Sequence, residues 1–205
     1  MATEIFPQNL GIHSASTANM VASGLRIRAT VGMMLIDRDS IVFVRSRKAP
    51  EDLSWCTLPQ EGVKFMDRSV RGTFVRGLNE ELKLRDHHVD MRTVKYLMVF
   101  HNKLPSDRTE GGQPTVKEIA YFAVRLKAGG LNAICPNPQE IAGIELASSW
   151  EQVDQIMATV AEHRVHKYIA TCLAIRAACR TKMLSWHVPA FMDARLNMHE
   201  PQRVH

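Results

Sequence analysis

Cysteines are few in this chain of 205 residues, and long apolar runs are absent. Its four cysteines contain no CxxC pair, which argues against a zinc site. Cys172 and Cys179 lie seven apart on a predicted helix and are expected to line its buried face rather than form a disulfide. No apolar run approaches the roughly 20 residues that span a membrane, and no signal peptide is recognisable near the N-terminus. We therefore expect a cytoplasmic protein with free thiols and no membrane segment.

The composition that remains is ordinary for a globular protein, with 45% hydrophobic and 23% charged residues. A net charge of +5 fits a polyanionic ligand such as a nucleotide or RNA, and it fits a merely basic surface equally well. The length indicates one domain with appendages. A homodimer is possible, but no motif indicates one, and no motif supports RNA.

The order of predicted elements gives an α/β domain. Aliphatic stretches at 26–35 and 41–44 flank a turn at 37–40 and predict a hairpin. The expected organisation is an N-terminal arm (1–24), a central domain (25–150), C-terminal helices (151–183) and a tail (184–205). Further strands are expected at 55–58, 93–101, 118–126 and 141–147, and a long loop of the type that covers binding sites at 104–116.

The stretch 58–84 reads as a strand end, a glycine-containing loop and a helix from about Ser69 to Leu82. Near its end the helix carries Arg76, Glu80 and Glu81. Two adjacent carboxylates repel each other, and a cation such as Mg²⁺ between them relieves that cost. Arg76 lies four residues before Glu80, so the two share one helix face and can form an ion pair.

This spacing resembles the Nudix box, which runs Gly, five residues, Glu, seven residues, Arg-Glu, an aliphatic, any residue, Glu-Glu, any residue, Gly and an aliphatic. Six of the nine fixed positions match, and three depart from the pattern. The matching residues are Gly62, Arg76, Leu78, Glu80, Glu81 and Leu84. The departures are Arg68 and Gly77 in place of Glu, and Lys83 in place of Gly.

The resemblance implies a Nudix-like α/β/α sandwich around a mixed sheet, here with additional C-terminal helices. It implies metal-dependent hydrolysis of a diphosphate linkage in a nucleoside diphosphate derivative or related nucleotide, with Mg²⁺ or Mn²⁺ as cofactor. The residues expected to act in catalysis are Glu80, Glu81, Arg76 and Glu61. Those expected to hold the metal are Glu80, Glu81 and Glu61, with Gly62 and Lys64 binding the ligand.

The departures bear on activity more than on fold. Gly77 lies one turn before Glu81, so it removes a carboxylate that would share a metal with Glu81. Glu61 is the candidate replacement, and the alternative is that its side chain points to water; Asp67 is a weaker substitute. The resemblance also implies an added ligand or general base from the regions of Glu118 and Glu140. A second interpretation therefore stays open, in which the domain keeps its fold but has lost catalysis and serves as a nucleotide-sensing or partner-binding module.

Overall fold

The computed structural model describes residues 24–47, 56–64, 67, 69–103, 114–158 and 165–197. The predicted arm up to residue 23, Trp55, Arg68, most of the loop at 104–116 and the end of the predicted tail (198–205) lie outside these residues. The strands are β1 (Arg26–Asp37), β2 (Ser40–Ser46), β3 (Cys56–Thr57), β4 (Gln60–Gly62), β5 (Val89–Lys103), β6 (Thr115–Leu126) and β7 (Ile141–Ala147). The helices are α2 (Val70–Leu82), α3 (Trp150–Met157), α4 (Val165–Arg180) and α5 (Ala190–Asn197), with a 3₁₀ turn η4 (Leu131–Ala133).

The strands form one mixed sheet, as the resemblance implied. Its main path runs β3-β2-β1-β6-β5, with β4 paired to β1 and β7 paired to β2. The β1–β6 pair is parallel and the other pairs are antiparallel. In the β1–β4 ladder Glu61 lies opposite Val31, and in the β1–β6 ladder Val31 lies beside Ala120. These pairings place the loop that precedes α2 beside the centre of the sheet.

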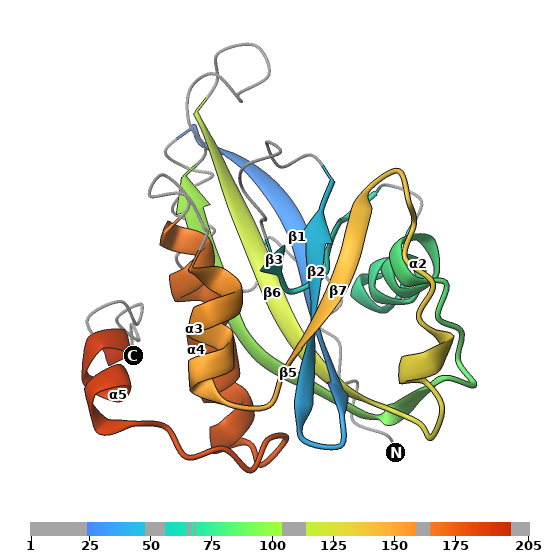
Figure 1. Ribbon diagram of the computed structural model, residues 1–205. Helices are drawn as coiled ribbons and strands as arrows, with labels where there is room; N and C mark the ends of the chain where they lie inside the picture. Colours follow the sequence, from blue (N-terminus) through green and yellow to red (C-terminus); the bar gives the residue numbers. More distant parts are fainter. Residues whose placement is uncertain are drawn as a thin grey trace.

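Helices cover both faces of the sheet, so the architecture is the predicted α/β/α sandwich (Figure 1). Alternate residues of a strand point to opposite faces, and the buried side chains divide accordingly into two clusters. One cluster joins alternate strand residues to Val70, Phe74, Leu78 and Leu82 of α2. The other joins the opposite face to α3, α4 and α5. No helix among the described residues is long and apolar enough to cross a membrane.

The predicted hairpin is present, with Arg38 at φ 54° in the turn between β1 and β2. Residues that follow α4 pack on this hairpin. The Ser185 N–H donates to Asp39 Oδ1 at 2.9 Å, and the Trp186 Nε1–H donates to the Asp39 carbonyl at 2.9 Å. The Trp186 ring meets Trp150 edge-on at 6.2 Å, and the chain then forms α5. All four cysteines are free, and Cys172 is buried as expected.

Candidate functional site

Helix α2 begins and ends at residues that fix its position. The Ser69 hydroxyl accepts a hydrogen bond from the Gly72 N–H at 3.0 Å and caps the N-terminus. At the other end Lys83 is left-handed, with φ 57° and ψ 20°. The Leu84 N–H bonds to the Leu78 carbonyl at 3.0 Å, as in the closing turn of many helices. The box position that holds Gly in the family pattern thus keeps its backbone conformation here, despite the Cβ of Lys83.

Arg76 joins α2 to the loop that precedes it. Its guanidinium contacts Glu61 Oε1 at 2.9 Å and Glu80 Oε2 at 3.0 Å, both through Nη1. Through Nη2 it also donates to the Gly62 carbonyl at 2.7 Å. The hydrogen bonds that Arg76 donates to Asp67, Glu61 and Glu80 outweigh desolvation and raise the pKa of Arg76 above its usual value. Arg76 is therefore a permanent cation that contacts three of the predicted site residues, Glu61, Gly62 and Glu80.

Asp67 makes the strongest contact with Arg76. Its two carboxylate oxygens accept from Arg76 Nε at 2.7 Å and Nη2 at 2.8 Å, a bidentate arrangement. The Thr73 hydroxyl donates to Asp67 Oδ2 at 2.8 Å, and so does the Lys64 N–H at 2.7 Å. Hydrogen bonds from Arg76 hold the pKa of Asp67 far below its usual value. The sequence offers Asp67 as a weaker substitute for the missing box carboxylate, whereas in the structure its carboxylate binds Arg76.

Gly72 permits this close approach of the loop to the helix. A Cβ at residue 72 would lie 2.1 Å from the Asp67 carbonyl oxygen, a distance that no side chain can adopt. The Ser69 N–H also donates to that carbonyl at 2.6 Å. In sequence terms Gly72 is only a cost to the helix, about 1 kcal/mol relative to Ala. The contact with Asp67 explains why a glycine is present.

Glu81 is the buried carboxylate of the site. Only 8% of the residue is exposed, and none of the described residues gives its side chain a hydrogen bond or an ion pair. Burial raises the pKa of the Glu81 carboxyl to about 8, and the negative charges of Glu61 and Glu140 add to the increase. A buried carboxylate without a donor is costly when ionised, and a cation beside it would remove that cost.

Glu61 occupies the space that a side chain at residue 77 would need. A Cβ at Gly77 would lie 2.8 Å from Glu61 Cβ and 2.9 Å from Met33 Cε. The Glu61 side chain is 14% exposed and reaches Arg76, so it does not point freely to water. A carboxylate from β4 thus stands beside the helix turn from which the box carboxylate is missing.

The oxygen-only donor set fits a hard cation such as Mg²⁺ or Mn²⁺. Glu81 is the residue that most needs a cation, and Glu61 is the carboxylate with the largest effect on it. Three of the expected groups have protein partners: Glu61 and Glu80 both pair with Arg76, Glu80 also lies 3.3 Å from Lys64 Nζ, and the Gly62 carbonyl accepts from Arg76. Within the described ranges no group of three or more His, Cys, Asp or Glu side chains is arranged to hold a metal ion. Glu81 is thus the expected metal ligand whose side chain has no hydrogen bond or ion pair with the described residues.

Glu118 and Glu140 lie in different surroundings. Glu140 is exposed at the loop before β7 and close enough to Glu81 to raise its pKa. Glu118 is buried in β6, where its Oε2 lies 2.9 Å from His101 Nε2 on β5. Sequence reasoning gave no role to His101, since a lone histidine in a predicted strand carries no signal.

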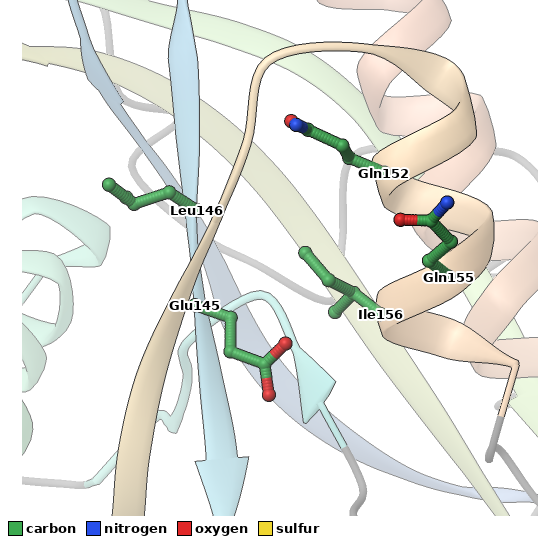
Figure 2. A pocket seen from close by; sticks show the side chains of 5 residues that line it. All are labelled: Glu145, Leu146, Gln152, Gln155 and Ile156. Atoms are coloured by element: carbon green, nitrogen blue, oxygen red, sulfur yellow. The ribbon is translucent and has the colours of Figure 1, made fainter.

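A cavity of about 390 Å³ lies elsewhere, between β7 and α3 (Figure 2). It is lined by Glu145, Leu146, Gln152, Gln155 and Ile156. Helix α3 belongs to the layer opposite α2, so neither Glu61 nor Glu81 lines this cavity. Glu145 is already paired with Arg45 and accepts from the Cys56 thiol at 3.3 Å.

A comparison with family models matches the NUDIX domain over residues 26–172, so this chain belongs to that family. No curated protein matches its sequence. Among solved structures it is similar to a NUDIX hydrolase from Nitrosomonas europaea, at 14% identity and a TM-score of 0.49, covering 77% of this chain and 91% of that one. It is also similar to the E. coli dihydroneopterin triphosphate pyrophosphohydrolase, at 10% identity and a TM-score of 0.47, covering 68% and 90%. A third is a bifunctional NMN adenylyltransferase/ADP ribose pyrophosphatase from Francisella tularensis, complexed with AMP and a Mn ion, at 16% identity and a TM-score of 0.47, covering 79% and 45%.

Proposed function

We propose that this Nudix domain hydrolyses a diphosphate linkage in a nucleoside diphosphate derivative, with Mg²⁺ or Mn²⁺ as cofactor. The observation that carries the proposal is Glu81, a buried carboxylate without a hydrogen-bond donor among the described residues, next to the carboxylate of Glu61. A protein that needed only the fold would be more stable with an amide or an apolar side chain at this place. The presence of a buried carboxylate at this place favours a site that binds a cation.

The contacts of each residue indicate its role in this function. Glu81 and Glu61 would hold the metal, which when bound polarises the diphosphate and activates water. Arg76 orients Glu61 and Glu80 through Nη1, and Asp67 fixes Arg76 in turn. Lys64 is half exposed beside Glu80 and offers a positive charge to a phosphate group.

A second function, a domain that binds nucleotides without cleaving them, is favoured by a different observation. Arg76 already binds Glu61, Glu80 and the Gly62 carbonyl, three of the oxygen groups expected at the site. A guanidinium that occupies these oxygens leaves fewer ligands for a metal. Such a domain would act as a sensor or partner-binding module.

Hydrolysis and metal binding measured together separate the two functions. The chain is incubated with Mg²⁺ or Mn²⁺ and a panel that includes ADP-ribose, nucleoside triphosphates and nucleotide sugars, and Mn²⁺ affinity is measured by calorimetry. We expect metal-dependent release of a nucleoside monophosphate or phosphate from at least one compound, and loss of both turnover and Mn²⁺ binding in Glu81→Gln. Matched Glu151→Gln, an exposed carboxylate at the start of α3, should keep both. Nucleotide binding without turnover in the presence of either metal would establish the second function instead.

A further inference from the structure

A second set of side chains lies on the sheet face that α2 covers. In the β5–β6 ladder His101 lies opposite Glu118, and β6 then continues to Ala120, which lies beside Val31. Directly paired residues project to the same face, and so do residues two apart along a strand. Glu118 and His101 therefore share a face with Ala120 and Val31, and through the β1–β4 ladder with Glu61.

Tyr96 presents an aromatic surface on this face. Its ring meets the buried Phe122 edge-on at 5.6 Å, and Phe122 meets Phe74 of α2 edge-on at 6.1 Å. This row of rings holds Tyr96 in place, yet 44% of Tyr96 is exposed. A ring that is fixed by packing and open on one side loses little conformational entropy when a flat ligand stacks on it.

The His101–Glu118 pair adds polar groups to the same face. Glu118 is 3% exposed, while the His101 side chain keeps 18% of its surface exposed. Glu118 also lies near enough to Tyr96 for its charge to add to the effect of burial in raising the pKa of Tyr96. The hydrogen bond to Glu118 fixes the orientation of the imidazole, so His101 offers a positioned polar edge.

The distance between the side chains of Tyr96, His101 and Glu118 and the carboxylates at Glu61 and Glu81 suits one elongated ligand. At a strand spacing of about 4.8 Å and a rise of about 3.3 Å per residue, the backbone of Glu61 lies about 12 Å from that of Glu118, which is two strands and two residues away. It lies about 16 Å from that of Tyr96, which is opposite Phe122, three strands and two residues away. An aromatic face with an oriented polar edge is how proteins recognise an unstacked nucleobase. Carboxylates that bind a cation at the other end suit its diphosphate.

We propose that Tyr96 and the His101–Glu118 pair recognise the base of a nucleotide whose diphosphate lies at Glu61 and Glu81, an inference that rests on the proposed function. Tyr96 stacks on the base, and His101, held by Glu118, hydrogen-bonds its edge. These are specificity-determining residues, and they take no part in bond cleavage. Their removal should weaken binding of the nucleoside part and leave binding of the diphosphate part unchanged.

The test uses ligands that cannot be cleaved, so that it does not depend on turnover. Affinities for the α,β-methylene diphosphates of adenosine, guanosine, cytidine and uridine are measured by calorimetry with Mg²⁺, alongside methylene diphosphonate, which lacks the nucleoside. We expect at least one nucleoside ligand to bind more than 10-fold tighter than methylene diphosphonate. Tyr96→Leu should then lower that affinity by about 5- to 100-fold, as loss of one stacked base predicts, and leave methylene diphosphonate unchanged.

Further variants separate recognition from folding and from chemistry. Tyr96→Phe keeps the ring and should bind almost as well as the parent, while His101→Gln should raise KM for a cleaved nucleotide with little change in kcat. Phe191→Leu removes a 71% exposed ring on α5, in the opposite layer, and should change nothing. Equal affinity for all five ligands, or a loss in Tyr96→Leu that also affects methylene diphosphonate, overturns the inference, as does a fall in kcat alone in His101→Gln. Nucleoside-dependent binding that needs Tyr96 but is accompanied by no hydrolysis supports the inference and removes the proposed function.

Discussion

The side chain of Glu61 on β4 fills the space beside Gly77, the box position at which the family pattern has a glutamate. A Cβ at residue 77 would lie 2.8 Å from the Cβ of Glu61, closer than side-chain carbons approach each other. The same glycine allows α2 to lie against Met33 of β1, whose Cε would be 2.9 Å from that Cβ. Loss of the Glu at 77 and the position of Glu61 are thus two parts of one packing arrangement.

Gly77→Ala is therefore expected to destabilise the domain. Helix propensity alone predicts a gain of about 1 kcal/mol, but overpacking in a close contact costs about 1 to 3 kcal/mol. We expect a net loss of about 1 kcal/mol in the free energy of unfolding, measured in urea. Gly143→Ala is the control, because a Cβ there meets no heavy atom within 4 Å. A gain of stability in Gly77→Ala would show that Glu61 and Met33 move aside easily.

Asp67→Asn tests the residue that holds Arg76. The amide has the same volume as the carboxylate. It carries no negative charge, and only one of its two terminal atoms can accept a hydrogen bond, whereas both Asp67 oxygens accept from the guanidinium. The Asp67 side chain is only 4% exposed, so we expect a loss of about 2 kcal/mol in the free energy of unfolding. Asp90→Asn is the matched control: its partner Arg92 is 89% exposed, and such pairs contribute less than about 1 kcal/mol. Equal losses of unfolding free energy in the two variants would mean that the buried Asp67–Arg76 pair stabilises the fold no more than an exposed ion pair.

The family pattern predicted the α/β/α layers and the helix that carries Glu80 and Glu81, because both depend on spacings that the sequence displays. Sequence reasoning missed β4 and α5. Three residues give too little periodicity for a strand to be recognised. Helix α5 is held by tertiary contacts with α4, such as that of Arg176 Nη1 with Asn197 Oδ1 at 2.7 Å, which helical spacing does not reveal. The bidentate hold of Asp67 on Arg76 was also missed, since it depends on a tight turn before the helix rather than on helical spacing. His101 and Glu118 come together through strand register, which a single sequence does not reveal.

Lys83→Gly should stabilise the domain. Lys83 adopts φ 57°, a left-handed conformation that costs a residue with a Cβ about 1 kcal/mol relative to glycine. We expect a gain of about that size in the free energy of unfolding, because the hydrogen bonds that close α2 involve only backbone atoms. Lys83→Ala keeps the Cβ and should show no such gain. If Ala stabilises as much as Gly, the effect comes from removal of the lysine charge and not from the backbone.

Glu81→Gln should change how stability depends on pH when no metal is present. The pKa of Glu81 is raised from its ordinary 4.5 to about 8 in the folded state, chiefly by burial, so the folded protein holds a proton that the unfolded chain releases. The stability from this proton is fully present below about pH 4.5 and is lost as pH rises toward 8, at up to about 1.4 kcal/mol per pH unit. The lowered pKa of Asp67 has the opposite sign, but that contribution changes only in more acidic solution. The parent should therefore lose stability relative to Glu81→Gln between about pH 5 and 8 in EDTA.

Excess Mn²⁺ should abolish this relative loss, because a bound cation stabilises the ionised carboxylate of the parent and not the amide. Unfolding curves at several pH values, with and without Mn²⁺, measure both effects. Parallel pH profiles for the two proteins in EDTA would show that Glu81 is solvated and that its burial does not control its charge.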